Sequence, residues 1–363
     1  MTVPPGPAAA AEPSLTGGPA RGPVDEGVPV SPAQLTATAA AIAEVQLPSG
    51  LIPWFPGGHA DPWNHTEAAM GLVTAGHRGE AERAYDWLCR TQRPDGSWHA
   101  YYLPHGVADP KLDANGVAYV ATGVWHHWLA TGDPGFAHAL FPVVDRAVEF
   151  VLDLQTHRGE VLWARRADGW PWSYALLTGS SSISHSLGCA LALAAVVGAE
   201  RPGWAEARRR LVRTVATRPD AFAPKHRWAM DWYYPVLVGA VTGADASARL
   251  AAGWDTFVLD SRGVRCVSDE PWVTAAETCE CAMAYLRTGD AATSRRLLGW
   301  AQRHRDEAGS YHTGIVYPEQ VHFPAAETST YTAAAVILAA DALAGVSPTS
   351  RLFLADPHLP SRA

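Results

Sequence analysis

Apolar residues recur at helical spacing along nearly the whole chain after residue 33, and helices of two kinds alternate. Helices of the first kind, such as those at 187–197 and 333–340, are uncharged and hydrophobic nearly all round, which predicts burial. Helices of the second kind, such as those at 78–90 and 295–305, are charged on one face. The periodicity predicts twelve helices, at 32–45, 65–75, 80–92, 115–130, 136–155, 182–197, 204–216, 233–241, 246–257, 274–286, 291–302 and 329–343.

Six buried helices alternating with six amphipathic ones predict an all-α fold, an (α/α)6 toroid of six inner and six outer helices. Thr131-Gly132-Asp133 and Thr288-Gly289-Asp290 each join a glycine that ends an inner helix to an aspartate that caps its outer partner. An open helical solenoid is the alternative, but its repeats would be more equal in length. Strand signals are few, so we expect no large sheet.

The chain divides into three parts by composition. Residues 1–33 are rich in Pro, Gly and Ala without periodicity and predict a disordered extension. Residues 34–346 form the toroid, which would carry any catalysis, and residues 347–363 form a C-terminal tail. The extension lacks a basic stretch followed by an apolar one, so we expect no secretory signal. No apolar run in the sequence indicates a membrane span.

Charge and cysteine content narrow the function classes. The net charge of -8, with scattered basic residues, argues against a nucleic-acid partner, because phosphate binding needs clustered Lys and Arg. The five cysteines are odd in number and mostly lie in apolar helical stretches, so we expect buried reduced thiols and a cytoplasmic protein. Cys279 and Cys281 lack a second Cys/His pair nearby, so no metal and no cofactor are expected. The oligomeric state is left open.

Each predicted inner helix begins with a cluster of polar, aromatic and acidic residues. In a closed ring the inner helices run parallel, so these clusters should gather at one end and form a bowl. Helix N-termini carry unpaired N–H groups and partial positive charge, which suit anionic or hydroxyl-rich ligands. The high count of 15 Trp adds flat apolar faces on which sugars can stack. The clusters lie at 61–65, 113–116, 179–185, 230–234, 274–280 and 327–331.

Paired carboxylates are the natural catalytic interpretation of such a bowl. Glycoside hydrolysis uses one carboxylic acid to protonate the leaving oxygen and a second carboxylate to assist attack. Any single acidic residue at a helix start is more often a cap, and Asp113 has this pattern most clearly. The candidates are Asp61, Glu67, Asp113, Asp231, Glu277, Glu280 and Glu327.

Asp61 and Glu277 are the favoured catalytic pair, and Asp231 is a third candidate. Asp61 lies among aromatic residues and follows Gly57-Gly58, which lets the backbone approach a ligand closely. Glu277 and Glu280 lie three apart on one helical face, where a carboxylate is costly unless it is paired or functional. The predicted substrate-binding residues are Trp54, His59, Trp63, His65, Asp113, Asn115, Ser181, His185, Trp232, Tyr233, Trp272, Glu280 and Tyr331.

Two further segments could indicate other chemistries, the serine run at 180–184 and the segment from Gln92 to Trp98. The serine run at 180–184 is not framed by a Gly-x-Ser-x-Gly elbow or a preceding strand, so hydrogen bonding to sugar hydroxyls is favoured over nucleophilic catalysis. The segment from Gln92 to Trp98 resembles the Gln-Trp motif of squalene and terpene cyclases. The sequence has neither their Asp-x-Asp-Asp motif nor the zinc ligands of protein prenyltransferases, and the segment is interpreted as a staple at a helix end.

Residues 34–346 resemble an actinobacterial group often described as prenyltransferase-like. Within that group the chain is similar to the methylmannose polysaccharide hydrolases of mycobacteria, endo-acting α-1,4-mannanases with an (α/α)6 fold. Asp113-Ala114-Asn115-Gly116 and the serine run bear a more distant likeness to glucoamylase-like glycosidases. The matching segments are PWFPGG (53–58), DPWNH (61–65), GVWHHW (123–128), TGSSSI (178–183), MDWYYP (230–235) and VRCVSD (264–269).

The resemblance implies hydrolysis of internal α-1,4-mannosidic bonds in a 3-O-methylmannose-type polysaccharide, with Asp61 and Glu277 at the positions of the acid/base pair. We take Asp61 as proton donor and Glu277 as the base that activates water, with inversion as the default outcome. Two alternatives stay open at this point. One is an isoprenoid cyclase or transferase, and the other is a non-catalytic toroid that binds glycans.

Overall fold

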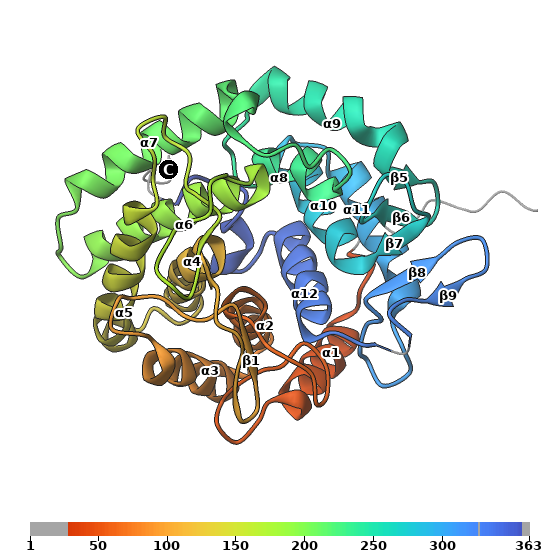
Figure 1. Ribbon diagram of the computed structural model, residues 1–363. Coiled ribbons are helices and arrows are strands. Elements are labelled where there is room, and N and C mark those ends of the chain that lie inside the picture. Colours follow the sequence, from red (N-terminus) through yellow and green to blue (C-terminus); the bar gives the residue numbers. More distant parts are fainter. Residues whose placement is uncertain (1–27, 326, 358–363) are drawn as a thin grey trace, which may run out of the picture.

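The computed structural model describes residues 28–325 and 327–357, and in this part of the chain it has the predicted double ring of α-helices (Figure 1). The inner helices are α2 (Pro62–Thr74), α4 (Ala114–Thr131), α6 (Leu177–Val196), α8 (Ala229–Leu237), α10 (Ala275–Arg287) and α12 (Thr330–Ala344). The outer helices are α1 (Pro32–Val45), α3 (Arg78–Thr91), α5 (Pro134–Asp153), α7 (Pro202–Thr217), α9 (Gly243–Phe257) and α11 (Ala291–Ala301).

The inner ring is closed by contact between its first and last members. Each inner helix packs against the inner helices before and after it, and α12 packs against α2. Helix α1 lies outside α12 and α2, so the first helix of the chain completes the outer ring (Figure 1). The predicted all-α toroid is therefore confirmed.

Caps and turns set the lengths of the helices. Gly132, with φ of 63°, ends α4, and Asp133 caps α5 by accepting from the Gly135 and Phe136 amides, as predicted. Asp290 caps α11 in the same way. Three inner helices begin three or more residues earlier than predicted, α2 by three, α6 by five and α8 by four. Polar residues of their clusters therefore lie within the first helical turns, where the sequence pattern suggests a preceding loop.

The predicted staple after Gln92 is part of a device that recurs between outer helices. The Gln92 side-chain amide donates to the carbonyl of Gly96 and to that of Val143 on α5, and Arg146 binds its Oε1. Gly96 has φ of 87°, and a Cβ there would overlap the carbonyl oxygen of Arg146. A glycine is therefore required at this close approach. Gln46 and Gln155 make the equivalent pairs of bonds.

Short strands decorate the end of the ring at which the inner helices begin. A two-stranded sheet pairs β1 (Tyr101–Leu103) with β2 (Gly106–Asp109), and another pairs β3 (Leu112–Asp113) with β4 (Ala164–Arg165). An antiparallel sheet runs in chain order through β5 (Val258–Leu259), β6 (Gly263–Arg265), β7 (Trp272–Thr274), β8 (Gly314–Val316) and β9 (Val321–His322). These sheets build the rim of the bowl and leave the core to the helices.

Both ends of the described chain are more ordered than the sequence suggests. Residues 1–27 lie outside the described residues, but 28–33, which were assigned to the extension, are folded, since Val30 is 3% exposed and Ser31 caps α1. Residues 347–357, assigned to the tail, contain the 3-10 helix η3 (Pro348–Arg351), which packs on α4 and α12. Leu352 and Phe353 are buried there. Apolar side chains hold this segment to the domain.

One helix corrects the expectation about apolar length. Helix α6 is long and apolar enough to cross a membrane by length and composition. However, 83% of the apolar stretch of this helix is buried inside the protein, and α4, α7 and α8 pack around it. Burial of that extent is what an inner helix of a ring requires.

Candidate active site

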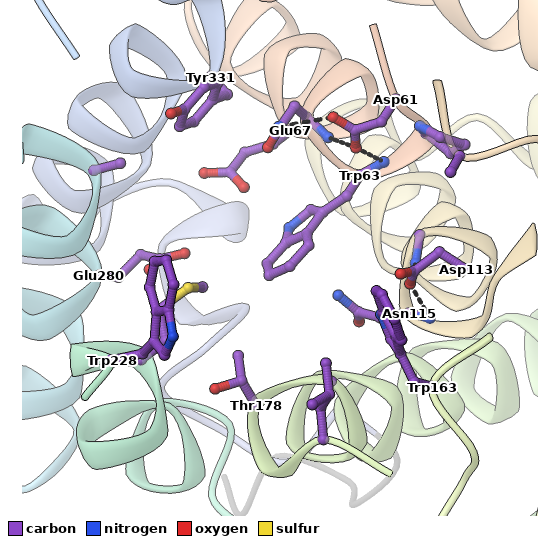
Figure 2. Close-up of a pocket in the computed structure, with 18 of the residues that line it drawn as sticks. Asp61, Trp63, Glu67, Asp113, Asn115, Trp163, Thr178, Trp228, Glu280 and Tyr331 are labelled. Atoms are coloured by element: carbon purple, nitrogen blue, oxygen red, sulfur yellow. Dashed lines mark hydrogen bonds between the residues drawn. The ribbon is translucent and has the colours of Figure 1, made fainter. Parts of the chain in front are cut away.

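A pocket of about 470 Å³ opens at the end of the ring where the inner helices begin (Figure 2). This size lies within the usual range for small-ligand sites. Side chains from the first turns of α2, α4, α6, α8, α10 and α12, and from the loops before them, line it. The predicted site residues that the structure brings together here are Trp54, Asp61, Trp63, Asp113, Asn115, Asp231, Glu277, Glu280 and Tyr331.

Asp61 is both the cap of α2 and a wall of the pocket. Its Oδ1 accepts from the backbone amides of Trp63 and Asn64, at 2.9 and 3.0 Å. Its Oδ2 accepts from Trp54 Nε1 at 2.5 Å and from Asn64 Nδ2 at 2.8 Å. Burial raises the pKa of Asp61, and the four N–H donors oppose that increase because they stabilise the ionised form. The carboxyl group is thus fixed in position with both oxygens bonded.

Glu67, an acidic candidate outside the favoured catalytic pair, also lines the pocket, from helix α2. Its side chain points toward the space between Tyr331 and Glu280 (Figure 2). It is 5% exposed, and burial, together with the charge of Asp61, raises its pKa to about 8. Burial therefore favours the neutral carboxylic acid form of Glu67.

Helix α10 carries the two glutamates that the sequence placed on one face. Glu280 is 7% exposed and accepts a hydrogen bond from the Tyr233 hydroxyl, and burial raises its pKa well above the ordinary value. Glu277 lies one turn earlier, nearer the pocket mouth, and is only partly buried. The Cys266 thiol lies against Glu277. Burial is the larger cause of the raised pKa of Cys266, and the negative charge of Glu277 is the second cause. Glu277 is the more accessible of the two acids.

Asp113 and Asp231 occupy other parts of the pocket wall. Asp113 caps α4 through the Asn115 and Gly116 amides, as its sequence pattern predicted, and burial raises its pKa. Asp231 accepts from the amide and the hydroxyl of Thr178, and burial raises its pKa as well. Because Asp231 Oδ1 receives both of these bonds, Thr178 on α6 ties the side chain to the neighbouring helix.

Aromatic side chains that sequence reasoning missed complete the pocket. Trp163, Trp228 and Tyr101 line it, together with Lys111, whose ammonium lies 4.4 Å from the Trp163 ring centroid. Trp163 and Tyr101 belong to hairpins far from any helix start, so the search for polar helix openings could not find them. Trp228 immediately precedes α8, and its position beside the 230–234 cluster was the one available signal.

Two predicted histidines and a serine are not brought to the pocket. His65 is fully buried on the outer side of α2, where its Nδ1 accepts from the Ile52 amide and its Nε2 contacts the Ala84 carbonyl. His185 lies deeper in α6 and bonds to the Leu352 carbonyl of the C-terminal segment. Ser181 bonds back to the Leu177 carbonyl within its own helix. In each case a backbone partner holds the side chain away from the bowl.

The remaining predicted substrate-binding residues do not line the pocket and pack outside its lining. Trp232 donates to the Arg249 carbonyl on α9 and stacks on Phe257, so its ring faces the outer helices. Tyr233 is buried beneath Glu280. Trp272 donates to the Phe323 carbonyl in the rim sheet. His59 packs on Trp54 at 4.5 Å between ring centroids, one layer behind the lining.

An anionic ligand is disfavoured by the charged groups of the pocket. Its lining carries more carboxyl groups than ammonium groups, which disfavours phosphates and other anions. Within residues 28–325 and 327–357, no cluster of three or more His, Cys, Asp or Glu could hold a metal ion. The acids are Asp61, Glu67, Asp113, Asp231, Glu277 and Glu280, and the cations are Lys111 and Lys225.

Solved structures of glycosidases share this closed double ring of helices. A wild-type glycosidase superposes with a TM-score of 0.68 and 16% identity, covering 86% of this chain and 98% of that one. A GH63 mannosylglycerate hydrolase from Thermus thermophilus has a TM-score of 0.68 and 13% identity, covering 84% and 99%. These likenesses concern the fold.

The sequence comparison gives the family. The chain is 49% identical over 329 residues to the MMP endo-(1,4)-3-O-methyl-α-D-mannosidase of Mycolicibacterium hassiacum, covering 90% of this chain and 91% of the relative. No protein-family model matches the chain. The chain belongs to the family of this mannosidase and is a glycoside hydrolase, which removes the isoprenoid and non-catalytic alternatives.

Proposed function

We propose that this enzyme hydrolyses internal α-1,4-mannosidic bonds of a partly 3-O-methylated mannose polysaccharide. The name of the mannosidase from Mycolicibacterium hassiacum describes this specificity, and the relative matches nine-tenths of the chain. The observation that carries the proposal is the joint presence of Asp61 and Glu277 in one pocket lined by indole and phenol rings. Aromatic faces suit pyranose rings, and their apolar surface suits methyl ethers.

In the proposed reaction Asp61 protonates the glycosidic oxygen as the bond to the leaving sugar breaks. Burial raises its pKa, which favours the protonated form before the step. Once the proton has left, the carboxylate is stabilised by the N–H groups of Trp54, Trp63 and Asn64. This differential stabilisation is what a general acid needs, because charge develops on it in the transition state.

Glu277 is proposed as the base that removes a proton from the attacking water. It lies on α10, a different helix from Asp61, and is the partly exposed acid of that helix. Attack by water from the face opposite the leaving group inverts the anomeric configuration. Asp231, held by Thr178, is the third candidate and is proposed to bind sugar hydroxyls or to substitute as the base.

We propose that the reaction takes place in the cytoplasm. All five cysteines are free in the structure, and four of them are buried, which agrees with a reducing compartment. The pocket's acidic lining supports a glycan as the ligand in place of a nucleic acid. A membrane partner has no role in this proposal.

The test is product analysis with matched variants. The purified enzyme is incubated with methylated and unmethylated α-1,4-mannose oligosaccharides, products are separated by chromatography, and the first-formed anomer is read by NMR. We expect Asp61→Asn and Glu277→Gln each to lower kcat by at least about 100-fold, in line with the loss of an acid or base. Asp133→Asn makes the same substitution at the cap of the outer helix α5, away from the pocket, and controls for the effect of the change on capping alone.

Two results would overturn the proposal. If the unaltered enzyme releases nothing from either oligosaccharide, the mannosidase assignment fails. If both carboxamide variants keep normal turnover, these acids only bind the substrate and other groups perform the chemistry.

A further inference from the structure

A hairpin at the rim carries several aromatic side chains, of which Trp163 lines the pocket and Trp170 is exposed to solvent. The aromatic hairpin (residues 162–175) contains β4 and is closed by hydrogen bonds from the Trp172 amide to the Ala164 carbonyl and from the Trp163 amide to the Tyr174 carbonyl. Its base is joined to the pocket wall, since Ala164 pairs with Asp113. The hairpin therefore stands next to the site and is anchored to it.

Three rings of the aromatic hairpin, those of Trp163, Trp172 and Tyr174, pack against one another. Trp163 lines the pocket, and its ring centroid lies 5.0 Å from that of Trp172 and 5.6 Å from that of Tyr174, with which it is stacked. The guanidinium of Arg166 lies 5.0 Å from the Trp172 ring centroid. These contacts fix the orientation of the inner rings, so the hairpin presents a firm aromatic surface.

Trp170, near the hairpin tip, is 72% exposed. Its carbonyl accepts a hydrogen bond from the Arg166 amide, and the next residue, Pro171, pairs with Arg165 across the hairpin. An indole with that much exposed surface has a cost in water unless a ligand covers it. Trp170 thus adds an exposed indole to the same hairpin that carries the packed rings of Trp163, Trp172 and Tyr174.

Exposed apolar side chains concentrate at this end of the molecule. Among the described residues, the exposed large hydrophobic side chains lie in rim loops before inner helices, with the exception of Val346 beyond the end of α12. Gathering of apolar surface around a cavity mouth is typical of a binding region. The rim residues are Leu103, Val107, Trp170, Trp228, Val321 and Phe323.

We propose that the aromatic hairpin is a remote glycan subsite, in which Trp170 stacks on a sugar ring of the chain portion that lies outside the pocket. The inference rests on the proposed function, because a polymer cut at an internal bond has to leave the pocket across the rim on at least one side. A cavity of about 470 Å³ holds only a short part of such a chain. The ligand is neutral and hydroxyl-rich, and its O-methyl groups would cover the exposed indole.

The test compares a long and a short substrate with the same set of variants. The long substrate is an O-methylated α-1,4-mannan, and the short one is a tetrasaccharide of the same linkage. In Trp170→Ala we expect KM for the long substrate to rise roughly three- to tenfold with kcat unchanged, as for loss of an aromatic contact. The short substrate should keep its normal KM. Trp170→Phe should recover most of the loss, and Val346→Ala should leave both substrates unaffected.

A direct binding measurement accompanies the kinetics. Calorimetry of the long glycan with Asp61→Asn, and with the same protein carrying Trp170→Ala, should give a Kd that is weaker by the same factor. An unchanged KM and Kd for the long glycan in Trp170→Ala, while the enzyme still cleaves the tetrasaccharide, would overturn the subsite and leave the proposed function standing. An equal loss on both substrates would also overturn it. An enzyme that neither cleaves nor binds either glycan would overturn both proposals.

Discussion

Replacing Trp54 by phenylalanine should move one limb of the pH–rate profile, and the limb that moves reveals the role of Asp61. The Trp54 indole donates to Asp61 Oδ2 at 2.5 Å, and phenylalanine removes this donor while keeping an aromatic ring against His59 and Tyr331. A hydrogen bond to a charged group is worth about 1.5–3 kcal/mol. Since one pKa unit corresponds to 1.36 kcal/mol and three other donors remain, we expect a movement of about 1 pH unit.

The direction follows from which form the donor stabilises. Trp54 stabilises the ionised carboxylate, so its loss raises the pKa of Asp61 further in the direction set by burial. If Asp61 is the general acid, the protonated form is active, and the alkaline limb of kcat/KM moves to higher pH. If Asp61 is the base, the ionised form is active, and the acidic limb moves to higher pH.

The assay is kcat/KM on a mannose oligosaccharide from about pH 4 to 9, with constant ionic strength. Trp228→Phe is the matched control, because Trp228 lines the same pocket immediately before α8 and makes no hydrogen bond to Asp61. A Trp54→Phe profile with both limbs unmoved would refute the reasoning, whatever happens to KM. Movement of the acidic limb alone would reverse the proposed acid and base assignments.

Two further predictions concern stability. Burial raises the pKa of Glu67 to about 8 in the folded protein, so the stability that it contributes is complete below about pH 4.5 and is lost as the pH rises toward 8. Glu67→Gln should therefore gain stability relative to the parent, by up to a few kcal/mol, between pH 4.5 and 8.5, and equal melting-temperature differences at both pH values would contradict this. Gly96→Ala should cost about 2–4 kcal/mol in urea unfolding, because its Cβ meets the Arg146 carbonyl at a positive φ. Gly132→Ala, which has a positive φ but open space, should cost less.

The fold could be predicted because its signal is repeated along the chain. Inner helices such as α6 are apolar nearly all round, and outer helices such as α3 and α7 are charged on one face, so errors at single boundaries do not change the count. Starts were missed at α6 and α8, where Thr178 and Asp231 lie inside the first turn. Polar residues of this kind favour caps on average, but here they face a pocket and continue the helix.

The candidate site was predicted only as far as the helix openings reach into the bowl. Asp61, Asp113 and Glu277 were found because they stand at helix starts, and the closed ring brings those starts together. His65 and His185 were wrong expectations because position along a helix does not give the direction of a side chain. The imidazole of His65 contacts the Ala84 carbonyl and that of His185 contacts the Leu352 carbonyl, both outside the pocket. Trp163 was missed because only the pairing of β3 with β4 brings it to the rim.

The proposed role of Asp61 shows why a capping residue and a catalytic residue cannot be told apart from the sequence. Both roles need a short carboxylate at a helix N-terminus, and the same backbone amides that satisfy a cap also stabilise a conjugate base. What distinguishes Asp61 from Asp133 is a second pair of donors, from Trp54 and Asn64, and a position on an inner helix. The partly exposed Asp133 accepts from its two cap amides and from Arg78. A catalytic function therefore depends on the closed ring, which places one of two similar caps inside a pocket.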